Sequence, residues 1–89
     1  MEFDLFSLHA VVAEAYLESM DKGLYQKIEV LESADVLPYQ VNIERGSKSS
    51  GVIHGKESYS FKTKEKALEK YYKTIHSMEQ QGFQQLQIV

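Results

Sequence analysis

The chain has no cysteine, one proline and five glycines among its 89 residues. Without cysteine, neither a disulfide framework nor a thiolate zinc site can form. No apolar run is long enough to span a membrane, because Ser7, His9 and Glu14 interrupt the most apolar stretch. No basic segment leads into an apolar one as in a secretory signal. We therefore expect one domain over residues 1–89, located in the cytoplasm.

Charge is distributed unevenly along the chain, although the net charge is only −3. Residues 1–44 contain nine acidic side chains and two lysines, whereas residues 45–73 contain eight basic side chains and three acidic ones. The net charge argues against a nucleic-acid binder. The basic second half, however, is typical either of an anion-facing surface or of solvated lysines around a helix start.

Residues 3–21 show apolar side chains at helical spacing and predict a helix that Gly23 ends. One stripe of this helix comprises Leu5, Leu8, Val12 and Tyr16, and an adjacent one comprises Phe6, Ala10, Ala13, Leu17 and Met20. Such a face is wide for a helix that rests on one small sheet. We therefore predict that the first stripe contacts a protein partner or a second copy. The alternative is that both stripes belong to the core.

Alternating side chains predict strands in the middle of the chain. Residues 24–32 form the first strand, with Ile28 and Val30 on one face, and Tyr25 is expected to be exposed on the other. Residues 39–45 form the second, and extended structure resumes after Gly51, so a hairpin tip is expected near residues 46–51.

The last part of the chain predicts a second helix. Thr63 is a suitable N-cap, Glu65 lies in the first turn, and Gly82 ends the helix. Its apolar face would comprise Ala67, Leu68, Tyr71, Tyr72, Ile75 and Met78. Residues 83–89 can add a short strand with Leu86 and Ile88 pointing inward. The predicted fold is α+β: a small antiparallel sheet of three to four strands with two helices, in the order α-β-β-β-α, with or without a final β.

No motif for nucleotide or metal chemistry is complete. Gly46 and Gly51 have the glycine spacing of a phosphate-binding loop, but Val52 and Ile53 stand where lysine and a hydroxyl residue are needed. The three histidines are far apart and none has a second ligand at short spacing; His54, next to the glycine loop, is the one to watch. We expect no cofactor, no metal and no enzymatic activity.

From about residue 25 to residue 84 the layout resembles the WGR domain. The matching parts are the strand YQVNIERG, the segment GSKSSGVIHGKESYSF, the helix TKEKALEKYYKTIHSMEQ and the closing QGF. Glu44 stands at the position of the signature tryptophan, and Arg45-Gly46 reverses the usual Gly-Arg. The resemblance implies a nucleic-acid-binding or interdomain-contact module, in which the basic loop is the contact surface and Arg45 contacts a phosphate.

Two functional hypotheses follow. The favoured one is a small protein-binding or regulatory module that self-associates or docks a partner through Leu5, Leu8, Val12 and Tyr16. The alternative is a nucleic-acid-binding module whose phosphate contacts are Arg45, Lys48, Lys56, Lys62 and Lys64. The net charge of −3 and the altered signature both count against the second, so we favour the first.

Overall fold

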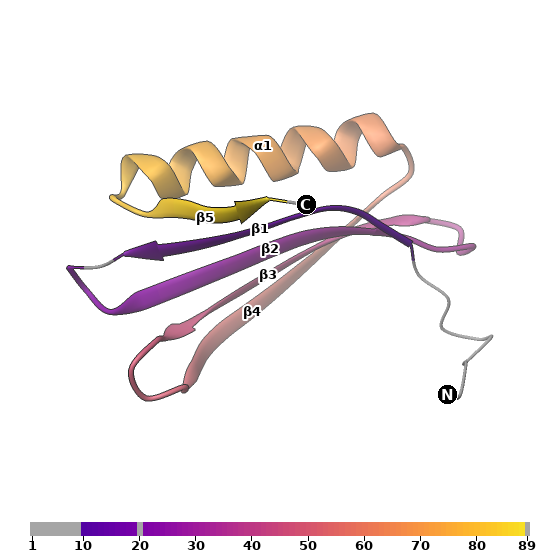
Figure 1. Ribbon diagram of the computed structural model, residues 1–89. Helices are drawn as coiled ribbons and strands as arrows, with labels where there is room; N and C mark the ends of the chain where they lie inside the picture. Colours follow the sequence, from indigo (N-terminus) through magenta and orange to yellow (C-terminus); the bar gives the residue numbers. More distant parts are fainter. Residues whose placement is uncertain (1–9, 20, 89) are drawn as a thin grey trace.

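One helix lies across one face of a five-stranded antiparallel sheet (Figure 1). The structure is a computed structural model that describes residues 10–19 and 21–88. The strands are arranged in the order β4-β3-β2-β1-β5, so that β4 and β5 form the two edges. The elements are β1 (Ala10–Ser19), β2 (Leu24–Glu32), β3 (Tyr39–Ser47), β4 (Ile53–Phe61), α1 (Lys64–Gln80) and β5 (Gln84–Ile88).

The predicted fold class is wrong in its first element. The helix expected over residues 3–21 is replaced, from Ala10 to Ser19, by β1, which pairs with β2 on one side and with β5 on the other. The described residues therefore form five strands and one helix, in the order β-β-β-β-α-β. Positions four residues apart share a face in a strand as well as in a helix, so the apolar spacing fits both.

The three strands predicted in the middle of the chain are confirmed as β2, β3 and β4. Each pairs antiparallel with the next, so they form a meander. The pairing places Ile28 between Ala15 of β1 and Ile43 of β3. Val30 lies opposite Val41, and both are fully buried. Because alternate side chains point to one face, this apolar set faces α1, while the polar set faces the opposite side of the sheet. We call that opposite side the open face.

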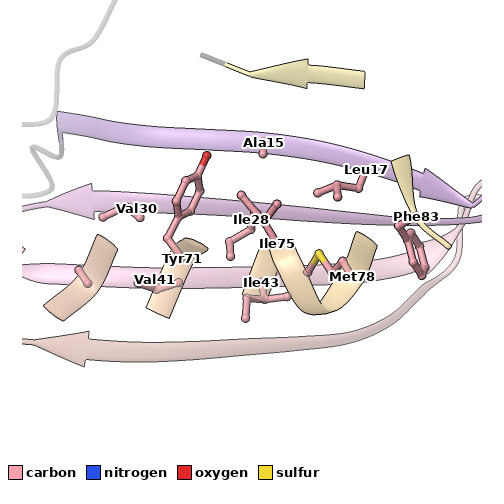
Figure 2. Close-up of a cluster of buried hydrophobic side chains, with 11 residues drawn as sticks. Ala15, Leu17, Ile28, Val30, Val41, Ile43, Tyr71, Ile75, Met78 and Phe83 are labelled. Atoms are coloured by element: carbon pink, nitrogen blue, oxygen red, sulfur yellow. The ribbon is translucent and has the colours of Figure 1, made fainter. Parts of the chain in front are cut away.

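The helix α1 begins and ends as its sequence predicts. The Lys66 amide donates to Oγ1 of Thr63 over 3.2 Å, and Gly82 adopts a φ of 100° just after the helix. The side chains that α1 buries against the sheet are Ala67, Tyr71, Ile75 and Met78. Figure 2 shows Tyr71, Ile75 and Met78 among the aliphatic side chains of β2 and β3. Burying one such side chain stabilises the fold by about 1.5–3 kcal/mol.

Two expected core residues lie at the surface. Tyr72 is 62% exposed and Leu86 is 55% exposed. Tyr72 follows Tyr71 directly, and adjacent residues of a helix point about 100° apart, so α1 cannot bury both against the sheet. Leu86 lies on the short edge strand β5, near the register shift in its pairing with β1. Phe83, immediately before β5, is 6% exposed and closes this end of the core.

The predicted tip between β3 and β4 is confirmed and depends on Gly46. The Ser47 amide donates to the carbonyl of Val52 over 2.9 Å. A Cβ at Gly46 would lie 2.5 Å from that same carbonyl oxygen and 2.8 Å from the ring of Tyr25. At Gly55 the nearest atom to an added Cβ is 3.8 Å away, on the Arg45 side chain, which is an ordinary contact.

We therefore expect Gly46→Ala to destabilise the chain by about 1–3 kcal/mol, because backbone must move to admit the methyl group. Gly55→Ala is the matched control and should change stability by less than about 1 kcal/mol. Urea unfolding followed by circular dichroism measures both. Equal stability of the two variants would contradict the close packing at Gly46.

Candidate interaction site

The five cations predicted to contact phosphates do not form one patch. Arg45, Lys48 and Lys56 lie toward the β3–β4 turn. Lys62 and Lys64 follow the opposite end of β4, a strand of nine residues. At about 3.3 Å per residue, the six residues from Lys56 to Lys62 separate the two groups by roughly 20 Å. One short contact cannot engage all five side chains.

Arg45 points to the α1 face of the sheet and pairs with an acidic neighbour. Its Nη2 lies 2.9 Å from Oε2 of Glu57 on β4, with both side chains partly exposed. The Tyr59 hydroxyl donates to Oε1 of the same carboxylate over 2.8 Å. The hydrogen bond from Tyr59, followed by the charge of Arg45, lowers the pKa of Glu57. The guanidinium that the WGR resemblance assigns to a phosphate is therefore already matched to a carboxylate.

Lys48 at the turn is also matched, in this case to an acid from the first half of the chain. Its Nζ lies 2.9 Å from Oε1 of Glu18 on β1, a residue that is only 6% exposed. The Lys48 amide donates to the carbonyl of Gly23 over 2.8 Å. The hydrogen bond from Lys48 lowers the pKa of Glu18. The β3–β4 turn is thus held against the β1–β2 turn, and one excess positive charge is cancelled.

The open face carries a tyrosine pair where the sequence predicts an exposed Tyr25. The rings of Tyr16 and Tyr25 stack at a centroid distance of 5.8 Å, and neither residue is fully exposed. The Tyr25 hydroxyl donates to Oε2 of Glu44 over 2.7 Å, which raises the pKa of Tyr25. Glu44, at the position of the WGR tryptophan, therefore fixes this stacked pair from β3. Cross-strand stacking of this kind contributes about 0.5–1.5 kcal/mol beyond burial.

A row of polar groups continues across the open face from the tyrosines toward β4. The Gln40 amide donates to Oγ of Ser58 over 2.8 Å, and that hydroxyl donates to Oδ1 of Asn42 over 2.8 Å. The Asn42 amide then donates to Oε2 of Glu29 over 3.2 Å. A hollow of about 270 Å³ lies beside this row, with Lys27, Glu44 and Lys56 in its lining. Acidic and basic side chains both line this hollow, and such a mixed surface does not favour the binding of a polyanion.

An apolar hollow lies between β1 and α1, and we call it the β1–α1 groove. It measures about 420 Å³ and is lined by Val12, Ala13, Lys64, Leu68, Tyr71, Tyr72, Ile75 and Gln85. It lies next to the part of β1 that β5 leaves uncovered, because β5 pairs with β1 only from Ala15 to Glu18. Among the described residues, Ala10 to Glu14 have a strand neighbour on the β2 side alone.

Of the four predicted interface residues, the two that the structure describes do not lie on one face of β1. Leu5 and Leu8 lie outside the described residues. Val12 lines the β1–α1 groove, whereas Tyr16 lies on the open face against Tyr25. The register of β1 shifts between Val11 and Ala13, which turns Val12 to the α1 side. A prediction that residues 10–19 are helical could not reveal the groove. The alternation of Ala13, Ala15 and Leu17 is the sequence pattern that indicates a strand here.

The histidines, which were the remaining candidates for metal binding, do not form a site in the described residues. His9 lies outside the described residues, and His54 is exposed near the β3–β4 turn. His76 contacts Gln80 on α1 over 3.2 Å. No group of three or more His, Asp or Glu side chains in the described residues could hold a metal ion. The one described helix is too short and too polar to cross a membrane.

Comparison with known proteins identifies no relative of this chain. No family model matches the chain, and no curated protein or solved structure matches it either. The resemblance to the WGR domain therefore stays a prediction. The surfaces described above are the basis for any functional proposal.

The Lys48–Glu18 pair gives a pH-dependent prediction. Because Lys48 lowers the pKa of Glu18 in the folded chain, the pair stabilises the fold above the ordinary carboxyl pKa. That contribution is lost as the pH falls through the lowered pKa. We expect Lys48→Met to be less stable than the parent at neutral pH, and the difference to vanish in acid. Thermal unfolding across a pH series measures it.

Lys56→Met is the control, because Lys56 is exposed on the open face and forms no ion pair within residues 10–19 and 21–88. The Lys56→Met variant should be as stable as the parent at every pH. A Lys48→Met difference that persists at low pH would show that the lysine acts by packing and not by its charge.

Proposed function

We propose that this chain is a small binding module without catalytic activity, and that it recognises an extended segment of another protein in the β1–α1 groove. The observation that carries the proposal is the combination of a strand edge and an apolar groove at one place. Ala10 to Glu14 offer backbone groups on the side that β5 does not cover. Val12, Leu68 and Tyr72 offer apolar surface directly beside them.

Strand addition is the binding mode that this geometry supports. A peptide paired with an edge strand gains main-chain hydrogen bonds, and its alternate side chains enter neighbouring hollows. On β1 such a peptide would lie in line with β5 and present every second side chain to the groove. Val11 is 52% exposed and Tyr72 is 62% exposed, so two large apolar side chains flank the position. Covering them would contribute to affinity.

The electrostatics support a protein partner more than a polyanion. Lys48 and Arg45 are each within 2.9 Å of a carboxylate, so a phosphate would have to compete with Glu18 and Glu57. The net charge of −3 opposes binding to a nucleic acid at long range. The cytoplasm remains our prediction for the compartment.

The proposal is tested by selecting binders from a random peptide library displayed on phage, with the full chain as bait. We expect enrichment of peptides in which aliphatic or aromatic residues alternate with polar ones. A synthetic peptide of that type should shift the backbone amide resonances of residues 10–14 on titration. Tyr72→Ser should weaken its binding about tenfold, the typical loss for an aromatic side chain central to an interface.

Lys66→Ser is the matched control, since it places the same residue at another exposed position of α1. It should leave peptide affinity unchanged. The proposal fails if no alternating peptide is enriched, or if enriched peptides bind Tyr72→Ser as well as they bind the parent.

A nucleic-acid-binding module is the second candidate, and one observation favours it. Lys62, Lys64 and Lys66 are all exposed around the start of α1, where helix amides also favour anions. This contact would involve the helix start and not the β3–β4 turn. Fluorescence anisotropy with labelled single- and double-stranded oligonucleotides at increasing salt distinguishes the candidates. Binding that falls steeply with salt would favour the second; no binding at low salt would eliminate it.

A further inference from the structure

The edge strand β4 has no covering element on its outer side within the described residues. It is the first strand in the sheet order and pairs only with β3. None of its nine residues is buried, which distinguishes it from β2 and β3. Its register is regular from Gly55 to Phe61; the one irregularity in its pairing is at His54, an extra residue of β4 between the partners of Arg45 and Gly46.

Natural proteins protect such edges with proline, bulges or inward-pointing charges. The single proline of this chain, Pro38, lies outside β4, which contains one lysine, Lys56, and one bulged residue, His54, at its turn end. From Gly55 to Phe61, however, the edge is regular and has no bulge or proline, and such an edge is a template for another strand. The charges along β4 indicate which strand can pair with this edge.

The charges of β4 select one register for pairing with a second copy. In an antiparallel pair of identical strands related by a two-fold axis, even-numbered residues lie opposite even-numbered ones and odd-numbered residues opposite odd-numbered ones. The residue on the axis lies opposite the same residue of the other copy. An axis at Lys56 would place two lysines face to face, and an axis at Glu57 would do the same for two glutamates. An axis at Tyr59 would place Lys56 opposite Lys62. Like charges directly opposite one another are destabilising.

An axis at Ser58 avoids all of these conflicts. It places Lys56 opposite Ser60 and Glu57 opposite Tyr59. Glu57 already accepts a hydrogen bond from Tyr59 within one chain, so the same two groups are compatible across the axis. Gly55 lies opposite Phe61, and a glycine leaves room for an aromatic side chain on the neighbouring strand. Axes nearer to either end would leave part of the strand without a partner.

We propose that two copies of this chain pair through β4, antiparallel and with the two-fold axis at Ser58, so that their sheets become continuous. On the open face, the two Ser58 hydroxyls meet beside Asn42 of each copy. On the α1 face, Glu57 and Tyr59 flank the axis, below Lys70 of α1, whose Nζ lies 4.2 Å from the centroid of the Tyr59 ring. This contact uses the edge opposite to the β1–α1 groove, so the two proposals stand or fall separately.

A cysteine scan tests the register, since the chain has no cysteine of its own. Only the residue on the axis faces its own copy, at the separation of about 4.5–5.5 Å between Cα atoms that a disulfide needs. Ser58→Cys should therefore form a disulfide-linked dimer under mild oxidation, measured by mass spectrometry. Lys56→Cys and Ser60→Cys should each stay uncrosslinked, because their copies lie about 13 Å apart along the strands. Mixing those two variants should yield the mixed dimer.

A charge series tests affinity without a covalent link. Ser60→Glu should tighten the dimer and Ser60→Lys should weaken it, because residue 60 lies opposite Lys56 twice in the symmetric pair. The expected change is about twofold to thirtyfold in each direction. Analytical ultracentrifugation of the parent and both variants over a range of concentrations measures it. Circular dichroism confirms that all remain folded.

The proposal is overturned if the parent stays monomeric at all concentrations, if crosslinking is fastest at residue 56 or 60, or if the two charge variants associate equally. Assembly into open-ended chains, as expected when β4 pairs with β5 of another copy, would also overturn it. Tyr72→Ser should leave the dimer intact, which separates this result from the test of peptide binding.

Discussion

The packing of α1 against β2 and β3 is the interaction on which the rest of the structure depends. Tyr71, Ile75 and Met78 cover Ile28 and Ile43, and this single layer of apolar contact is the core of the molecule (Figure 2). Among the described residues, no second layer covers the other face of the sheet. The open face must therefore be stabilised by polar and aromatic contacts between strands.

One ion pair, between Lys48 and Glu18, joins the two oppositely charged halves of the chain. The sheet order places β1 and the β3–β4 turn close enough for Glu18 to reach Lys48. Glu44 is engaged by Tyr25, and Glu57 by Arg45. Acidic and basic side chains thus neutralise one another across strands. Backbone at the sheet edges and apolar surface beside α1 are exposed as well as the lysines around the start of α1, and the pairing of the turn cations is the physical reason for our preference for a protein partner.

The two edges of the sheet differ in what they offer. At the β1 side, β5 is short and leaves a strand segment next to an apolar groove, which suits an extended peptide. At the β4 side the edge is long and polar, and its charge pattern is compatible with itself in one register only. The two proposed contacts therefore use opposite edges of the sheet (Figure 1).

The sequence by itself determined the elements whose signals are local. The alternation in residues 24–32, the Thr63 cap and Gly82 each depend on near neighbours, and these predictions are confirmed. Only the tertiary structure decided that residues 10–19 form a strand, because spacings of four residues satisfy helix and strand alike and the choice depends on backbone pairing with β2 and β5. It also decided which charges are paired, since the partners of Lys48 and Arg45 are set by strand order and not by distance along the chain.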